Sequence, residues 1–355
     1  MIVTFGELLL RLEVPNPFRF SQTFPGPLYS TFAGAECNMA VGIAALGGKA
    51  RLSTVLPAHD LGQSAIRFLR GWGVDTDSIT MAPNGRLGTY YLEHGAGLRA
   101  GQVLYDRAGS TFALAAESDY SWDAIFENAE SFMISAISPA VSEQAAAVSL
   151  KAVQEAKKRG IPVILDLNFR SKLWQWKPGV EVKTLAQQTM IPFLERADEV
   201  LTNLGQLNDV VNLNLPDCND PTEEAAQRGT KLLLQKYPKI QRVLITLRES
   251  LSASHNRWGA FGFDASQSQS SLSPLVAGQS APYEIESIID RVGVGDAFAA
   301  GYLRATQLPF TFQERLDYAT AASALAHYVH GDFLFFSHEE VLSLMKGNRD
   351  GRIRR

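Results

Sequence analysis

Cysteine is almost absent from this 355-residue sequence, which contains only Cys37 and Cys218. Two cysteines cannot form the disulfide framework on which small secreted domains depend. The N-terminus runs directly into a strand-like apolar segment and lacks the charged start and apolar core of a signal peptide. We therefore expect a cytoplasmic protein.

Long apolar runs and internal blocks of basic residues are also missing. The best candidate for a membrane span, 32–47, is too short and is interrupted by Glu36 and Asn38. The 33 Lys and Arg residues are balanced by 37 Asp and Glu residues, and the one dense group of arginines lies at 352–355. The sequence thus predicts neither a membrane nor a nucleic acid as a partner.

Two familiar phosphate-binding motifs are absent. Segment 42–50 has spaced glycines and Lys49 but not the Gly-Lys-Ser/Thr order of a P-loop. After Gly293 and Gly295, Phe298 stands where a dinucleotide-binding fingerprint has its third glycine. These absences disfavour P-loop enzymes and Rossmann dehydrogenases, so a phosphotransferase with this sequence would need another phosphate cradle.

Short apolar, β-branched runs alternate with helical stretches along the chain. The strand-like runs are 2–5, 51–56, 132–137, 163–167, 199–202 and 243–247. The helical stretches include 142–159, 222–236 and 296–306. This alternation predicts an α/β fold with a parallel sheet covered by helices on both faces.

A second pattern occurs in three segments that alternate apolar and polar residues and have no helices between them. These segments are 8–14, 88–93 and 102–107. We expect a small antiparallel sheet, which folds over the main domain as a lid built from segments of about 8–34 and 86–110. Lids exclude water from phosphoryl transfer. Exposed lid strands often pair between subunits, so we also expect a homodimer.

A polar stretch and a glycine-rich segment stand out near the C-terminus. The Ser- and Gln-rich segment 266–274 is predicted to be a surface loop. The sharper signal is a Gly-rich turn at the start of a helix, where Gly293, Val294 and Gly295 expose backbone N–H groups. These donors and the helix dipole can hold a phosphate, which makes an anion hole with Asp296 at its mouth. In an isolated motif, an Asp at this place more often caps the helix.

The segment 290–298 resembles a late signature of the ribokinase-like (PfkB) carbohydrate kinases, Asp-Thr-x-Gly-Ala-Gly-Asp-x-Phe. The segment 33–38 is similar to the family's early Gly-Gly-x-x-x-Asn segment, and its Ala-Glu pair is the form seen in 2-keto-3-deoxygluconate kinases. Further similarity to that subfamily lies at Tyr90 and in segments 103–110 and 166–174. The resemblance covers most of the chain.

This resemblance implies a fold and an activity. The fold is one ribokinase-like domain over 1–355, a three-layer αβα arrangement with a mainly parallel sheet and a small β-sheet lid, whose nucleotide-binding part is about 198–355. The activity is transfer of the γ-phosphoryl group of ATP, with Mg²⁺, to the terminal primary hydroxyl of a sugar acid, most closely 2-keto-3-deoxygluconate. In such a kinase, Asp296 is the catalytic residue that accepts the hydroxyl proton.

The resemblance also implies the binding residues. The substrate contacts are Gly34, Tyr90, Tyr105, Arg107, Arg170 and Asp332. The nucleotide contacts are Asn168, Asn203 and Thr246. Independently of the family, two arginines suit an acid, because a guanidinium can bind both oxygens of a carboxylate in a fork. A surface ion pair is the ordinary role of a lone arginine.

Several residues depart from the family pattern or lack a partner. Gln206 stands where the family has a Glu that organises magnesium through water, and Arg248 replaces a Gly near the nucleotide. No residue is predicted to bind a metal directly, and Gln206 would do so only through water. His327 and His330 lack a third ligand at a suitable spacing, so zinc is not predicted.

Two other functions remain open from the sequence. One is a kinase of a neutral sugar such as fructose or ribose, in which Arg107 and Arg170 are structural. The other is a sugar-acid-binding protein without turnover, which the replacements at Gln206 and Arg248 suggest.

Overall fold

The structure is a computed structural model and describes residues 1–348. The arginines of 352–355 and the end of the predicted domain range lie outside the described residues. Within 1–348, no helix is long and apolar enough to cross a membrane.

A nine-stranded sheet lies at the centre of the described residues, with strand order β14-β13-β12-β11-β10-β9-β1-β4 and with β17 beside β13. Six of these strands run parallel: β1 (Ile2–Phe5), β4 (Ala50–Ser53), β9 (Ser131–Ser135), β10 (Val163–Asp166), β11 (Glu199–Asn203) and β12 (Arg242–Ser252). The antiparallel pairs involve β13 (His255–Asp264), β14 (Gln269–Ser273) and β17 (Tyr283–Glu286). The predicted α/β fold with a mainly parallel sheet is confirmed.

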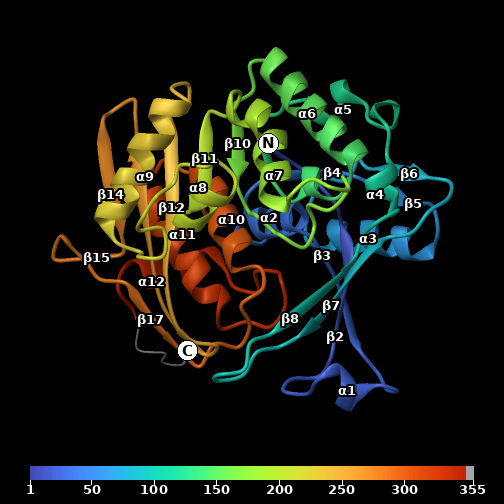
Figure 1. The fold of residues 1–355 in the computed structure, drawn as a ribbon, viewed down its shortest axis with the longest axis horizontal. Coiled ribbons are helices and arrows are strands. Elements are labelled where there is room, and N and C mark those ends of the chain that lie inside the picture. The colour runs from blue at the N-terminus through green and yellow to red at the C-terminus, as the bar shows by residue number, and fades with distance from the viewer. Residues whose placement is uncertain (349–355) are drawn as a thin grey trace.

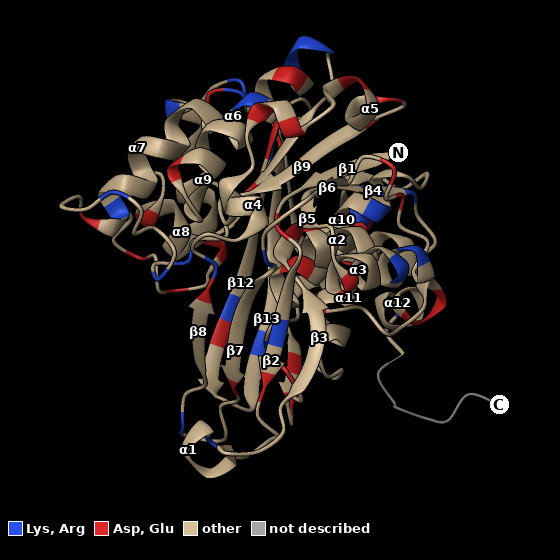
Figure 2. Cartoon of the chain, turned by 90° about the vertical axis from the view of Figure 1, so that its right-hand side faces the viewer, with Lys and Arg blue, Asp and Glu red and all other residues tan. Residues whose placement is uncertain are grey.

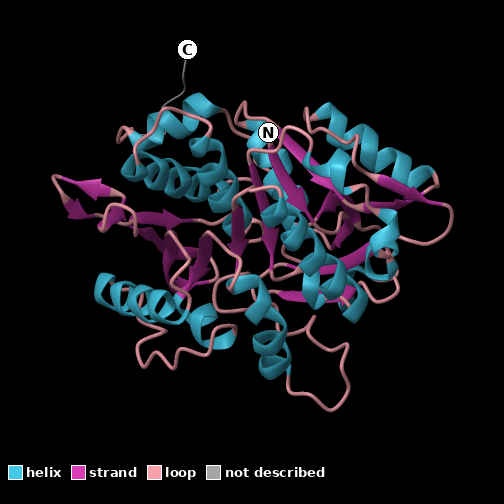
Figure 3. Cartoon of the chain, turned by 90° about the horizontal axis from the view of Figure 1, so that it is seen from above, coloured by secondary structure: helices cyan, strands magenta, loops and turns pink. Residues whose placement is uncertain are grey.

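Helices cover both faces of this sheet, as Figure 3 shows from above. One face carries α2 (Ala35–Ala45), α3 (Asp60–Gly71), α10 (Val294–Thr306), α11 (Phe312–Ala326) and α12 (His338–Met345). The other carries α4 (Thr111–Leu114), α5 (Trp122–Phe126), α6 (Glu143–Lys158), α7 (Val182–Leu194), α8 (Leu204–Asp209) and α9 (Glu223–Lys236). Short 3-10 helices span Glu117–Asp119 and Ser138–Ala140.

Each central strand contributes to two hydrophobic cores because its side chains point alternately to the two faces of the sheet. In β10, Val163 and Leu165 join the core on the α6 side, whereas Ile164 joins the core on the α10 side. A strand that is buried on both faces reads as a continuous apolar run. This is why these strands could be recognised from the sequence.

A separate four-stranded sheet has the order β3-β2-β7-β8. It is built from β2 (Leu9–Glu13), β3 (Tyr29–Ala33), β7 (Gly88–Glu93) and β8 (Gln102–Asp106). Figure 1 shows its strands projecting from the body of the molecule, with α1 (Phe20–Thr23) at the far end. At its tip, the backbone N–H of Ala253, in the β12–β13 turn, donates to the carbonyl of Gly97 at 2.9 Å. Basic and acidic residues interleave along β12, β13 and the projecting strands (Figure 2).

The prediction that this sheet is antiparallel is wrong for its central pair, because β2 and β7 run parallel. The pairs β2–β3 and β7–β8 are antiparallel. Parallel neighbours need a long crossover, and the chain between β2 and β7 passes through the main domain. The alternation of apolar and polar residues along a strand does not indicate whether the neighbouring strand runs parallel or antiparallel to it.

Two other local predictions are wrong. The Ser- and Gln-rich segment 266–274 contains strand β14, in which Ser271 and Ser273 are buried against the sheet. The apolar run 51–56 is divided between β4 and a second strand, β5 (Val55–Pro57), which pairs with β6 (Thr80–Ala82) in its own sheet. Backbone pairing with a neighbouring strand outweighs side-chain polarity at such positions. A further short hairpin joins β15 (Leu275–Val276) and β16 (Gln279–Ser280).

The close packing of α10 on α11 generates a test of the fold. A methyl group on Gly301 would lie 2.9 Å from the Ala322 side chain and 3.0 Å from the Ala319 Cα, so Gly301→Ala should destabilise the protein by about 1–3 kcal/mol. Gly71, at the end of α3, has nothing within 4 Å of an added methyl group. Gly71→Ala should be neutral or stabilise by up to about 1 kcal/mol. Urea unfolding of both variants measures the difference, and equal effects would contradict this helix packing.

Candidate active site

A pocket of about 570 Å³ opens where the carboxyl ends of β10 and β11 and the middle of β12 face the four-stranded sheet. Ligands of open α/β sheets bind at such carboxyl ends. The structure brings every predicted site residue to the lining of this pocket. They are Gly34, Tyr90, Tyr105, Arg107, Asn168, Arg170, Asn203, Gln206, Thr246, Gly293, Val294, Gly295, Asp296 and Asp332.

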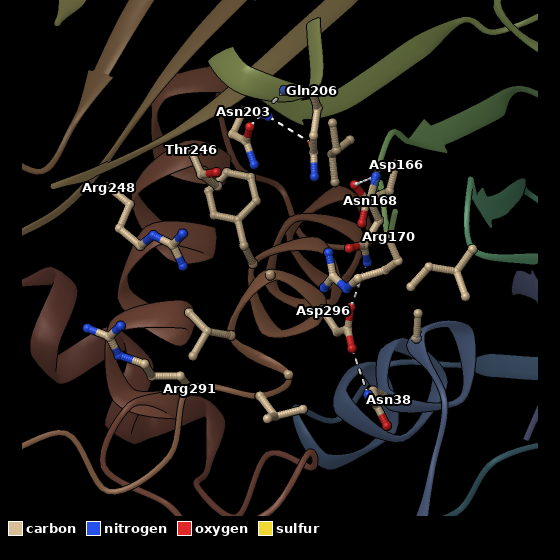
Figure 4. Close-up of a pocket in the computed structure, with 18 of the residues that line it drawn as sticks. Asn38, Asp166, Asn168, Arg170, Asn203, Gln206, Thr246, Arg248, Arg291 and Asp296 are labelled. Atoms are coloured by element: carbon tan, nitrogen blue, oxygen red, sulfur yellow. Dashed lines mark hydrogen bonds between the residues drawn. The ribbon is translucent and has the colours of Figure 1, made fainter. Parts of the chain in front are cut away.

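Asp296 is a buried carboxylate in the first turn of α10, and two amides hold it. The side-chain amide of Asn38, on α2, donates to one carboxylate oxygen at 2.6 Å. That of Asn168, just after β10, donates to the other at 3.2 Å. Figure 4 shows these contacts. Within residues 1–348, no basic side chain forms an ion pair with Asp296.

Burial, opposed by the Asn38 hydrogen bond and reinforced by the charge of Asp166, raises the pKa of Asp296 to about 8. Asp166 ends β10, and burial raises its pKa to about 7, although the Asn168 backbone N–H donates to it at 3.1 Å. Two interacting carboxyl groups titrate as a pair. A carboxylate that titrates near neutral pH can both accept and release a proton, as a general base requires.

The start of α10 has the backbone of an anion-binding site. Gly293 precedes the helix with φ +80°, and a Cβ there would lie 2.7 Å from the Asp332 carbonyl oxygen, so this position requires glycine. Gly295 is exposed, and an added Cβ would have nothing within 4 Å. The N–H groups of a first helical turn lack intrahelical partners and can bind a phosphate.

Four arginines line the same pocket, and three of them, Arg170, Arg248 and Arg291, have no carboxylate partner in 1–348. Arg170 donates only to the Phe169 carbonyl, at 3.1 Å, and Arg248 forms no hydrogen bond or ion pair with a described residue. Arg291 donates to the Asn256 side chain at 2.6 Å and to the Ser252 carbonyl. Partial burial and the Arg170 charge lower the pKa of Arg248. Such a group of like charges favours a polyanionic ligand.

Two of the predicted substrate residues in the lid segments, Tyr90 and Arg107, are already paired. The buried Arg107 guanidinium donates to Glu7 at 2.6 Å, and Ser110 donates to the same carboxylate. The Tyr90 hydroxyl lies 2.9 Å from both carboxylate oxygens of Asp332. These contacts preorganise the side chains that face the pocket.

Sequence reasoning missed three residues that shape the site. Asn38 stood in a recognised segment, but nothing indicated that it would contact Asp296. Asp166 also stood in a recognised segment, and only the structure shows its proximity to Asp296. Arg11 lies on an alternating strand, where a charged residue normally faces water, yet it is fully buried and forms an ion pair with Asp332.

Gln206 has a structural role in this site. Asn203 and Gln206 form a capping box at the start of α8, in which each side chain accepts the other's backbone N–H, at 3.0 and 3.1 Å. The Gln206 side-chain oxygen also accepts from the Thr202 hydroxyl at 3.3 Å. The Thr202 hydroxyl is nearer to the Asn203 carbonyl, at 3.0 Å, and the water-mediated metal contact of Gln206 stays a prediction.

Comparison with known proteins agrees with the geometry of this site. Residues 26–250 match the model of the pfkB family of carbohydrate kinases. The chain belongs to this family. The crystal structure of a 2-dehydro-3-deoxygluconokinase from Thermotoga maritima is similar, with a TM-score of 0.87 and 36% identity over 98% of this chain and 99% of that one.

Two characterised relatives also match over nearly their whole length. A 2-dehydro-3-deoxygalactonokinase from Haloferax volcanii is 28% identical over 99% of this chain and 98% of that protein. A 2-dehydro-3-deoxygluconokinase from Thermoproteus tenax is 25% identical over 93% of this chain and 89% of that protein. The similarity thus includes the sheet, the lid strands and the pocket between them.

The coupled carboxylates generate a prediction that needs no substrate. Asp166→Asn removes a negative neighbour and should lower the pKa of Asp296, whereas Asn38→Ala removes a donor to the carboxylate and should raise it. Titration of ¹³C-labelled aspartate carboxyls by NMR measures both shifts. Shifts of the same sign in the two variants would contradict the described contacts.

Proposed function

We propose that this protein is an ATP-dependent kinase that phosphorylates the terminal primary hydroxyl of a 2-keto-3-deoxy sugar acid, most closely 2-keto-3-deoxygluconate. The observation that carries the proposal is the Arg170 guanidinium, which lacks a carboxylate partner in 1–348 and shares a pocket with the buried Asp296. A free guanidinium beside a proton acceptor suits a substrate that has both a carboxylate and a hydroxyl. The named relatives act on substrates of this class.

In this proposal, Asp296 accepts the hydroxyl proton while the hydroxyl oxygen attacks the γ-phosphorus of ATP. The backbone N–H groups at Gly293, Val294 and Gly295 stabilise the negative charge on the transferring phosphoryl group. Asn38 and Asn168 orient the Asp296 carboxylate through their amides. Positioning and electrostatics supply the rate enhancement, and no covalent intermediate is needed.

The pocket has two walls that suit the two substrates. Tyr90, Tyr105 and Arg107 would contact the sugar acid from the lid side, and Gly34 and Asp332 would contact it from the adjoining main domain. On the opposite wall, Asn203 at the end of β11 and Thr246 within β12 would contact the nucleotide. Asn168 would contact the transferring phosphate next to Asp296.

Arg248 adds a positive charge to the nucleotide wall. It extends β12 beyond Thr246 and has no partner among the described residues. We therefore assign it to the phosphates of ATP, whose charge would compensate this guanidinium. The replacement of a glycine by Arg248 is then compatible with turnover.

A magnesium ion bound with ATP would supply positive charge to the phosphates. Asp166 is the residue that fits it best, directly or through water, because hard cations prefer carboxylate oxygens and because no described basic side chain forms an ion pair with Asp166.

A homodimer also stays part of the proposal, since β3 and β8 are the edge strands of the lid sheet.

An ATP-consumption assay across sugar acids and neutral sugars tests this function. We expect turnover with 2-keto-3-deoxygluconate or its galactonate epimer and little turnover with fructose or ribose. Equal or greater turnover with a neutral sugar would support the neutral-sugar kinase. Tight binding of the acid without phosphate transfer under any divalent metal would support the binding protein.

Arg170→Ala should weaken use of the sugar acid selectively. A hydrogen bond to a charged group is worth about 1.5–3 kcal/mol, so kcat/KM for the acid should fall roughly ten- to a hundredfold. A neutral analogue never made this contact, and its turnover should barely change. Arg86→Ala is the matched control, because Arg86 is a half-exposed lid arginine that pairs with Asp106 outside the pocket.

Arg107→Ala tests less directly whether an arginine binds the carboxylate of the sugar acid. Because Arg107 pairs with the buried Glu7, its loss leaves an uncompensated buried carboxylate and should destabilise the fold by about 3–5 kcal/mol. The ratio of kcat/KM for the acid to that for the neutral analogue, measured with Arg170→Ala, therefore decides whether the arginines bind the substrate carboxylate. An equal fall for acid and neutral substrates would make these arginines structural.

A further inference from the structure

Four potential metal ligands meet at the junction between the lid sheet and the main domain. Glu13 comes from β2, His94 follows β7, Asp290 precedes the glycine-rich turn and His330 follows α11. One ligand atom of each lies within 4.8 Å of the others. These residues are distant in sequence and lie outside the lining of the 570 Å³ pocket.

The distances suit ligands of one ion. The Glu13 carboxylate lies 2.9 Å from His94 Nε2 and 3.0 Å from His330 Nε2. The other ring nitrogen of His94, Nδ1, lies 3.9 Å from Asp290, so this carboxylate faces the opposite side of the ring from the nitrogen near Glu13. In a tetrahedral zinc site with bonds of about 2.0–2.1 Å, neighbouring ligand atoms are about 3.3 Å apart. The cluster therefore needs only small side-chain shifts to surround an ion.

The charges of the junction also favour a cation. The buried Arg11 guanidinium forms ion pairs with three carboxylates, those of Glu13, Asp290 and Asp332. When all three are ionised, one guanidinium leaves two negative charges uncompensated in a buried environment, which is costly. A divalent cation compensates both charges. Two protonated histidines would do the same, and this is the alternative to be tested.

Glu13 Oε2 already accepts from the Arg11 guanidinium, at 3.0 Å from Nε. Asp290 differs from Glu13 because backbone N–H groups also donate to its oxygens. It accepts from the backbone N–H groups of Arg291 and Val292, at 2.7 and 3.0 Å, and from that of Gly331 at 3.2 Å, besides its ion pair with Arg11. It therefore contributes mainly charge. Glu13, His94 and His330 are the direct ligands.

A second cavity, of about 390 Å³, reaches this cluster from outside. Glu13 and His330 line it, together with Tyr29, Phe333 and Phe335. The His330 side chain is 52% exposed, so an ion can enter from this side. A His₂Glu site with one face toward such a cavity leaves a fourth position for water.

We propose that Glu13, His94 and His330 bind one divalent transition-metal ion, best matched by Zn²⁺, at the junction of the lid and the main domain. Imidazole and carboxylate ligands suit zinc, whereas Mg²⁺ prefers an all-oxygen shell. The ion would join the ends of β2 and β7 to the segment after α11, and Asp290 would couple it to the turn that starts α10. This site is separate from the catalytic pocket and has its own ligand chemistry.

Metal analysis of the full-length protein tests the proposal. The protein is stripped with a chelator, dialysed against Zn²⁺ and assayed for bound zinc by mass spectrometry and calorimetry. We expect one Zn²⁺ per chain and a rise in Tm on addition of zinc, with no comparable rise on addition of Mg²⁺. His330→Ala, which changes a residue at the rim, should reduce zinc affinity by at least about tenfold without loss of the fold.

His255→Ala is the matched control, because His255 also pairs with a glutamate, Glu284 at 3.1 Å, but outside the junction. It should bind zinc like the unmodified protein. If the unmodified protein retains no more zinc than the double variant His94→Ala/His330→Ala, the proposal is overturned.

Discussion

The site depends on one buried carboxylate that has no ion-pair partner among the described residues. Asp296 stands at the head of α10, and the amides of Asn38 and Asn168 reach it from α2 and from the end of β10. Three elements distant in sequence must therefore pack together before this carboxylate can accept both hydrogen bonds. Burial raises the pKa of Asp296 to about 8, and positive charge brought close to it, such as that of a magnesium ion bound with ATP, would lower this pKa. The same geometry that costs stability when Asp296 is charged makes it a suitable proton acceptor.

The lid is attached to this carboxylate through a second buried network. Arg11, on β2, forms an ion pair with Asp332, and Tyr90, on β7, donates to the same carboxylate. Asp332 in turn accepts from Asn38 at 3.3 Å, the residue that holds Asp296. Breaking a buried ion pair on one side leaves an uncompensated charge, so the lid cannot easily separate from the main domain. The position of the lid is therefore coupled to the catalytic pocket by direct contacts.

Much of the fold could be predicted from the sequence because its signals are local. Strand β10 is a continuous apolar run because both of its faces are buried. The start of α10 is marked by Gly293, whose positive φ favours glycine. Pairing direction is not local, so the parallel β2–β7 contact and the strand β14 were missed. Likewise, nothing in the sequence indicates that Arg11 is buried or that Gln206 caps a helix. The candidate pocket was predicted through recognised segments, while the contacts that tune its carboxylates depend on tertiary structure.

The most direct test of this account is the Asp296→Asn variant, measured for both binding and turnover. The Asn side chain has the same size as Asp, and burial already raises the pKa of Asp296 to about 8, so the neutral amide should preserve the fold and the affinity for the sugar acid and ATP within about threefold. Turnover should fall by at least about a hundredfold, because the general base is lost. Near-normal kcat in this variant would contradict the central claim that Asp296 accepts the hydroxyl proton.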